Sequence, residues 1–325
     1  MLFMKLFIIL LVVNTAVFSS TSDEINMALK NGRINQARTL VQQISQNSSE
    51  FKYKDFFNAQ ISLNSGELDK AEEFIVRALK NNPVAKVFSL AGGIYGMQAA
   101  NASIFSKLGY AKKSKKNLLK AYELEPINKN YITGLLQFNM QAPSIVGGDS
   151  DQIIPLLNQL EKVDEKSAVQ MHTIYLADEE GEDKALAYID GKISGKPDVL
   201  YLQYYRAFLF ENNENFEAAQ NAYNQIIMSK PSDLVGDDYS SWSDALYRFG
   251  RIASIEEKWL QEGKKYFITY LQLESIKNST SEAWANYRLG LIYLHLDDNE
   301  NAKSSFQKAR KSNPDKELKK RLNKI

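Results

Sequence analysis

The sequence has 325 residues, 44% of them hydrophobic and 24% charged, and this composition predicts a folded chain rather than a disordered one. Forty basic residues against 39 acidic ones give a net charge of +1, which argues against a nucleic-acid partner. Cysteine is absent, which excludes disulfides, a thiolate zinc site and a cysteine nucleophile. His172 and His295 are the only histidines, so we expect no metal site and no cofactor.

The N-terminal segment, residues 1–19, is predicted to be a signal peptide. Lys5 precedes an apolar run from Leu6 to Val13, and a cleavage site falls before Ser20. The run is shorter than the roughly 20 residues that a membrane-spanning helix needs, although extending it to Phe18 leaves an uncleaved anchor as the alternative. We therefore expect an exported protein, periplasmic or secreted, whose only membrane contact is made by this segment.

Two short units follow the predicted signal peptide. Each one, residues 25–44 and residues 51–83, has the pattern of two amphipathic helices joined by a turn, and Gly32 and Gly66 mark the turns. Pro83 ends the second unit, because proline cannot continue a helix.

The third unit, residues 84–126, is predicted to have a long first helix from about Val84 to beyond Ser106. Small residues on that helix indicate close approach by another helix; they are Gly92, Gly93, Gly96, Ala99, Ala100 and Ala102. The second helix, residues 112–124, directs a lysine run outward, and the run comprises Lys112, Lys113, Lys115, Lys116 and Lys120. Such a run is typical of a solvated face, and the alternative is binding to phosphate or anionic lipid.

An irregular insertion follows in the fourth unit, at residues 141–151. Pro143 is predicted to end the preceding helix, and Gly147 and Gly148 permit positive φ angles. The loop could bind an anion through free amides, but it lacks the lysine of a phosphate-binding loop. A connection that reshapes the helix stack is the favoured interpretation.

The fifth unit has the weakest pattern. Helical segments are predicted at residues 171–176 and 185–189, and Gly191, Gly195 and Pro197 are expected to break the chain soon afterwards. The acidic turn at residues 178–183 lacks the alternating ligands of a calcium loop. We place a boundary here, between an N-terminal group of repeats at residues 20–198 and a C-terminal group at residues 199–325.

The C-terminal units at residues 200–231, 243–274 and 284–314 have the clearest pattern. In the last unit the apolar or small positions are Leu289, Gly290, Tyr293, Ala302, Phe306 and Ala309, followed by Pro314. This order resembles the tetratricopeptide repeat (TPR), a helix-turn-helix unit of about 34 residues. The resemblance implies an all-α, right-handed superhelix of seven or eight hairpins, with residues 315–325 as a capping helix. Residues 95–154 are also similar to a group of exported bacterial TPR proteins.

The resemblance also implies a non-enzymatic scaffold that binds a peptide or a partner helix in a concave groove. In the family, the second, fifth and ninth places of each first helix face that groove. Transferred to this sequence, these places give Tyr201, Tyr204, Phe208, Tyr247, Arg251, Trp284, Tyr287 and Leu291. Several of these rings could equally pack in the core. The fifth and ninth places hold no lysine and asparagine pair of the kind that binds the terminal carboxylate of chaperone tails in some TPR proteins.

Two other functions stay open from the sequence alone. One is a structural protein of the cell envelope that binds anionic surfaces through the lysine run. The other is a small-ligand carrier or an enzyme that uses the irregular centre, residues 141–197. Because no serine, histidine and carboxylate set stands in a recognisable local frame, we expect no catalytic residues and no enzymatic activity.

Overall fold

The computed structural model describes residues 20–229 and 231–325, and the predicted signal peptide lies outside them. Within the described residues the chain forms seventeen α-helices and no strand. The helices are α1 (Thr21–Lys30), α2 (Ile34–Gln43), α3 (Lys54–Asn64), α4 (Leu68–Asn81), α5 (Ala85–Asn101), α6 (Ile104–Leu124), α7 (Lys129–Gln141), α8 (Ile153–Val163), α9 (Glu165–Glu179), α10 (Glu182–Gly195), α11 (Leu200–Asn212), α12 (Phe216–Ile227), α13 (Gly236–Glu256), α14 (Leu260–Tyr270), α15 (Thr280–His295), α16 (Asn299–Lys311) and α17 (Lys316–Leu322).

Consecutive helices pack as hairpins, from α1–α2 to α15–α16, and α17 packs on α15 and α16 at the C-terminal end. The eight hairpins confirm the predicted all-α hairpin solenoid. No helix in the described ranges is long and apolar enough to cross a bilayer.

Helix pairing follows from amphipathic stripes and from small residues at the contacts. In α4, Ala71, Ile75 and Ala78 repeat at helical spacing and are fully buried. In α13, a methyl group added at Gly250 would lie 2.6 Å from the Phe267 ring of α14. Glycine therefore sets how closely these two helices approach.

The third hairpin differs from the prediction in where its helices meet. The first helix does not continue beyond Ser106: α5 ends at Asn101, and Ser103 adopts an extended conformation at the start of α6. The sequence carried only a weak signal for this break, because serine is a favoured N-cap residue but the Ser103 side chain makes no capping hydrogen bond. Close packing is confirmed at Gly92, where an added methyl group would lie 2.6 Å from the Leu118 side chain, whereas Gly93 faces open space.

Two further local predictions need correction. Gly147 has φ +98°, as expected, but Gly148 is needed for space, because an added methyl group would lie 1.7 Å from the Ala142 carbonyl oxygen. Gly191 does not break the chain, since α10 continues to Gly195. The fully buried side chains of Ala185 and Ile189 hold α10 in place, which outweighs the cost of about 1 kcal/mol for a glycine inside a helix.

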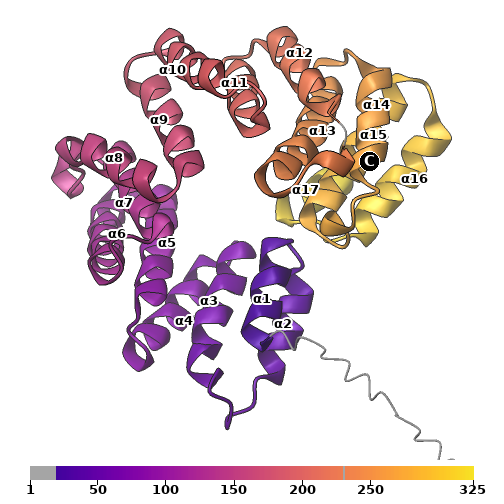
Figure 1. Cartoon of the computed structure of the whole chain (residues 1–325). Helices are drawn as coiled ribbons and strands as arrows, with labels where there is room; N and C mark the ends of the chain where they lie inside the picture. Colours follow the sequence, from indigo (N-terminus) through magenta and orange to yellow (C-terminus); the bar gives the residue numbers. More distant parts are fainter. Residues whose placement is uncertain (1–19, 230) are drawn as a thin grey trace, which may run out of the picture.

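The solenoid curves until its two ends meet, so that the molecule forms a closed ring (Figure 1). The Arg33 guanidinium donates to the carbonyl oxygens of Lys277 (Nε, 2.9 Å) and Glu274 (Nη2, 3.2 Å). The Asn313 amide donates to the Gly32 carbonyl oxygen at 2.6 Å. We call these three hydrogen bonds the ring joint. They bring the α1–α2 turn against the C-terminal repeats.

Candidate functional site

Two adjoining cavities lie where the C-terminal repeats face the α1–α2 turn. One, of 440 Å³, is lined by Tyr204, Asp244, Tyr247, Arg248, Arg251, Tyr270, Thr280, Ser281 and Trp284. The other, of 530 Å³, shares Asp244, Tyr270, Thr280 and Ser281 with it and is also lined by residues 29–32 and Ile34 of the N-terminal hairpin. We call the pair the inner cavity. Its size is in the usual range for ligand pockets.

A buried carboxylate positions the two arginines of this cavity. Glu211 of α11 is 5% exposed, and it accepts hydrogen bonds from Arg248 Nη1 at 3.2 Å, from Arg251 Nη1 and from the Tyr223 hydroxyl at 2.7 Å. A charge this deeply buried is stable only when it is paired and hydrogen-bonded, and here both conditions are met. The pairing fixes both guanidiniums at the cavity wall.

Arg248 is also held by two aromatic side chains of α11. Its Nε donates to the Tyr204 hydroxyl oxygen at 3.1 Å, and its guanidinium lies over the Phe208 ring at 4.6 Å from the centroid. Burial raises the pKa of Tyr204 to about 12, so the hydroxyl stays protonated at neutral pH. Tyr204 can therefore accept from Arg248 and still donate to a ligand.

Asp244 adds a carboxylate one helical turn before Arg248 on α13. Its side chain is accessible from the cavity. Desolvation by the surrounding protein nevertheless raises the pKa of Asp244, although the positive charges of Arg248 and Lys166 act to lower it. Asp244, Arg248 and Arg251 share one helix face at spacings of four and three residues. The cavity thus presents a carboxylate beside two guanidiniums.

Aromatic rings from three helices form the other walls. The Tyr247 ring of α13 lies 5.3 Å from that of Tyr270 in α14. On α15, Trp284 lies beneath the guanidiniums of Arg288 (5.2 Å) and Arg321 (5.7 Å). These arrangements combine broad apolar faces with hydrogen-bond donors, as binding hot spots do.

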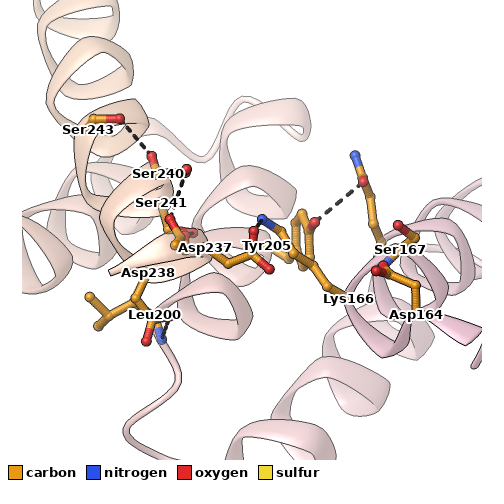
Figure 2. Close-up of polar contacts among 12 residues, drawn as sticks. Asp164, Lys166, Ser167, Leu200, Tyr205, Asp237, Asp238, Ser240, Ser241 and Ser243 are labelled. Carbon is orange, nitrogen blue, oxygen red and sulfur yellow. Dashed lines mark hydrogen bonds and ion pairs between the residues drawn. The ribbon is translucent and has the colours of Figure 1, made fainter. Parts of the chain in front are cut away.

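A polar network ties the first turns of α13 to earlier helices (Figure 2). Lys166 of α9 pairs with Asp237 at 2.8 Å, and Asp238 accepts from the backbone amide of Leu200 at 3.0 Å. The second contact places a carboxylate at the N-terminus of α11, where the helix dipole favours a negative charge. Helix α13 therefore contacts α9 beyond the adjacent α11–α12 hairpin, and its later residues line the inner cavity.

The sequence-predicted groove residues divide between the cavity and the packing around it. Tyr204, Tyr247, Arg251 and Trp284 line the cavity, and Phe208 lies under Arg248. Tyr201 packs in a cluster with α9 and α10. Tyr287, 8% exposed, packs against Phe306, and Leu291 is partly buried against the same α15–α16 cluster.

Several residues that line or support the cavity were not predicted from the sequence. Arg248 directly follows a predicted groove residue, but the family frame has no place for it. Asp244 and Arg248 could have been found from their four-residue spacing, and Glu211 from its position as an acidic residue in the apolar run AFLFEN. Thr280 and Ser281 carried no usable signal. Across the described ranges, no cluster of histidine and carboxylate side chains has the arrangement of a metal site.

Helical hairpins that stack on their neighbours and enclose a recessed surface define the class of helical-repeat proteins. Within that class, residues 285–316 match the family model described as "Tetratricopeptide repeat". The chain therefore contains a tetratricopeptide repeat at residues 285–316, within a stack of helical hairpins. The fold is typical of scaffolds for protein–protein interaction, which bind protein partners.

Comparison with solved structures gave matches at low sequence identity. A tetratricopeptide repeat protein from Parabacteroides merdae ATCC 43184 is 15% identical, with a TM-score of 0.42 over 85% of this chain and 98% of the other. The Cut9 and Hcn1 hetero-tetramer of APC/C is 13% identical, with a TM-score of 0.44 over 96% and 56%. The human IFIT1 dimer with PPP-AAAA is 13% identical, with a TM-score of 0.37 over 90% and 62%. A search of curated proteins found no match to this sequence.

Proposed function

We propose that this protein is a non-catalytic scaffold that binds a short segment of a partner protein in the inner cavity. The observation that carries the proposal is the pair of arginines, Arg248 and Arg251, fixed at an aromatic-lined cavity by the buried carboxylate of Glu211. Donors held in advance lose little conformational freedom when a ligand arrives, which favours affinity. The tetratricopeptide fold supports a protein or peptide as the partner.

The ring joint favours a short segment over a long partner helix. The α1–α2 turn contributes one wall of the inner cavity, so a helix lying along the whole groove would meet this turn. A loop or a chain end of the partner could enter without opening the ring. Carbonyl or carboxylate oxygens of such a segment would accept from the guanidiniums, and its apolar side chains would pack on Tyr247 and Trp284.

Site-specific photocrosslinking in the native cells tests this proposal. Ser281 is exposed and lines both parts of the inner cavity, so a photoreactive phenylalanine analogue placed there would contact any bound segment. Gln307 is exposed on α16 and provides the outer-surface control. We expect a protein that crosslinks from position 281 and not from position 307. Equal crosslinking from both positions, or none from position 281, would refute binding in the inner cavity.

We also propose that the scaffold acts in the cell envelope, as a periplasmic or secreted protein. The apolar run at residues 6–13 supports export. A second support is that the capping box of α1, formed by Ser20 and Asp23, begins at the predicted cleavage site. Cell fractionation with N-terminal sequencing tests the localisation. A cytoplasmic protein that retains residues 1–19 would contradict it, and an envelope protein that retains them would be anchored.

A further inference from the structure

The outer face of α6 carries exposed apolar side chains that the proposed function does not use. Phe105 is 94% exposed, the most exposed large hydrophobic side chain in the described ranges, and Leu108 and Leu119 are 39% and 38% exposed. All three lie on one face of α6, because they are spaced by three and then eleven residues. Phe105 and Leu108 are neighbours at the start of this face, and adjoining exposed apolar side chains mark an interaction site more often than a single exposed one does.

Lysines occupy the same face between these apolar residues. Lys112 and Lys116 stand seven and eleven residues after Phe105, which directs them to the same side of α6. Neither forms an ion pair in the part of the chain that the structure describes. Their neighbours Lys113 and Lys120, by contrast, are paired with Glu72 and Glu123. The face therefore carries a positive charge that the protein does not neutralise.

The opposite side of α6 fixes the direction of this face. The Ser114 hydroxyl donates to the Gly92 carbonyl oxygen at 2.8 Å, and Ala111, Leu118 and Ala121 are buried. Helix α6 consequently cannot rotate to bury Phe105 without losing its packing on α5. Figure 1 shows α6 on the outer rim of the ring, away from the ring joint.

We propose that the outer face of α6 binds the surface of an anionic lipid bilayer, with Phe105 and Leu108 entering the interface and Lys112 and Lys116 contacting lipid phosphates. Aromatic and aliphatic side chains flanked by lysines are the combination that interfacial helices use. Lysine is suited to this role because its long aliphatic stem packs on apolar groups while the ammonium stays in the headgroup layer. Lipid phosphates would supply the negative charge that Lys112 and Lys116 do not meet within the described part of the protein.

A local fluorescence reporter tests the proposal on the full chain. Because the native sequence has no cysteine, Ser106→Cys creates a single labelling site next to Phe105 for an environment-sensitive dye such as NBD. We expect a blue shift and an increase in emission on addition of phosphatidylglycerol vesicles. The response should be much smaller with phosphatidylcholine vesicles and should fall in 1 M salt, where the screening length is about 3 Å.

Variants and a second labelling site make the test specific. In the Ser106→Cys background, Lys112→Glu with Lys116→Glu should weaken vesicle binding by about tenfold or more, and Phe105→Asp should abolish the blue shift. A dye at Met228→Cys, also at an exposed apolar position (76%) but directly after the end of α12, should not respond. Equal responses at both sites, or no response at position 106 with anionic vesicles, would overturn the proposal and leave a protein partner as the remaining occupant.

Discussion

Glu211 illustrates how one residue can hold a binding surface in place. It is the single acidic group that Arg248 and Arg251 share, and its side chain is only 3% exposed. Removing one partner of a buried ion pair costs about 3–5 kcal/mol, because the remaining charge is left uncompensated. Both arginines are about one third exposed, and water reduces that cost.

We therefore predict that Glu211→Gln lowers the free energy of unfolding by roughly 1–3 kcal/mol. The amide cannot offset two guanidinium charges, so Arg248 and Arg251 would separate and the cavity wall would lose its order. Urea denaturation of this variant beside Glu214→Gln, an exposed neighbour, measures the effect. Equal stability of the two variants would show that Glu211 does not hold the arginines.

Asp164 makes a pH-dependent contribution at the start of α9. Partial burial opposes ionisation, but hydrogen bonds from Lys129 and Ser167 lower the pKa of Asp164 from 3.8 to about 2. A depressed folded-state pKa stabilises the fold above the unfolded pKa, and the stabilisation disappears as the pH falls through about 2. The stability difference between wild type and Asp164→Asn should therefore shrink between about pH 4 and pH 2. A difference that does not vary with pH would contradict this assignment.

At the scale of the elements, two adjacent glycines on α5 provide a matched test of helix packing. Gly92→Ala places a methyl group against Leu118 and should destabilise the protein by about 1–3 kcal/mol. Gly93→Ala meets open space and should stabilise it by about 0.5–1 kcal/mol, because alanine is the better helix former. Thermal denaturation of both variants measures whether each one is more or less stable than the wild type. Stabilisation by both substitutions would mean that Leu118 moves aside, and destabilisation by both would contradict the open space at Gly93.

The sequence predicted the hairpins because amphipathic spacing and turn residues are local signals. It failed at the α5–α6 junction, where no glycine or proline marks the break and Ser103 alone starts the new helix. The sequence also could not distinguish residues that line the cavity from residues that pack in the core. Tyr247 and Tyr287 both stand at the fifth place of their repeats, yet Tyr247 lines the cavity and Tyr287 packs on Phe306. That difference depends on the curvature of the whole stack, which no single repeat encodes.

At the scale of the whole molecule, the ring depends on a small polar contact. Arg33 and Asn313 supply its three hydrogen bonds, and each hydrogen bond contributes about 1 kcal/mol. Arg33→Ala with Asn313→Ala should therefore open the ring without unfolding the hairpins. Small-angle X-ray scattering should show a larger radius of gyration and a longer maximum dimension, with unchanged helical content.

A charge-matched control for this experiment is Lys80→Ala with Gln42→Ala, two exposed positions away from the joint. Its scattering should match that of the wild type. If the joint variant also scatters like the wild type, the three hydrogen bonds do not determine the closure.

Closure also changes how the protein can lose its structure. In an open stack of repeats, a terminal hairpin has only one neighbour, so melting spreads inward from the two ends. In this ring the α1–α2 turn also contacts the segments that flank α15–α16, at Glu274, Lys277 and Asn313, so each end of the stack has contacts on two sides. Fraying of either end must then break both sets of contacts, and the unfolding of the first and last hairpins becomes cooperative although Gly32 and Asn313 are 281 positions apart in the chain.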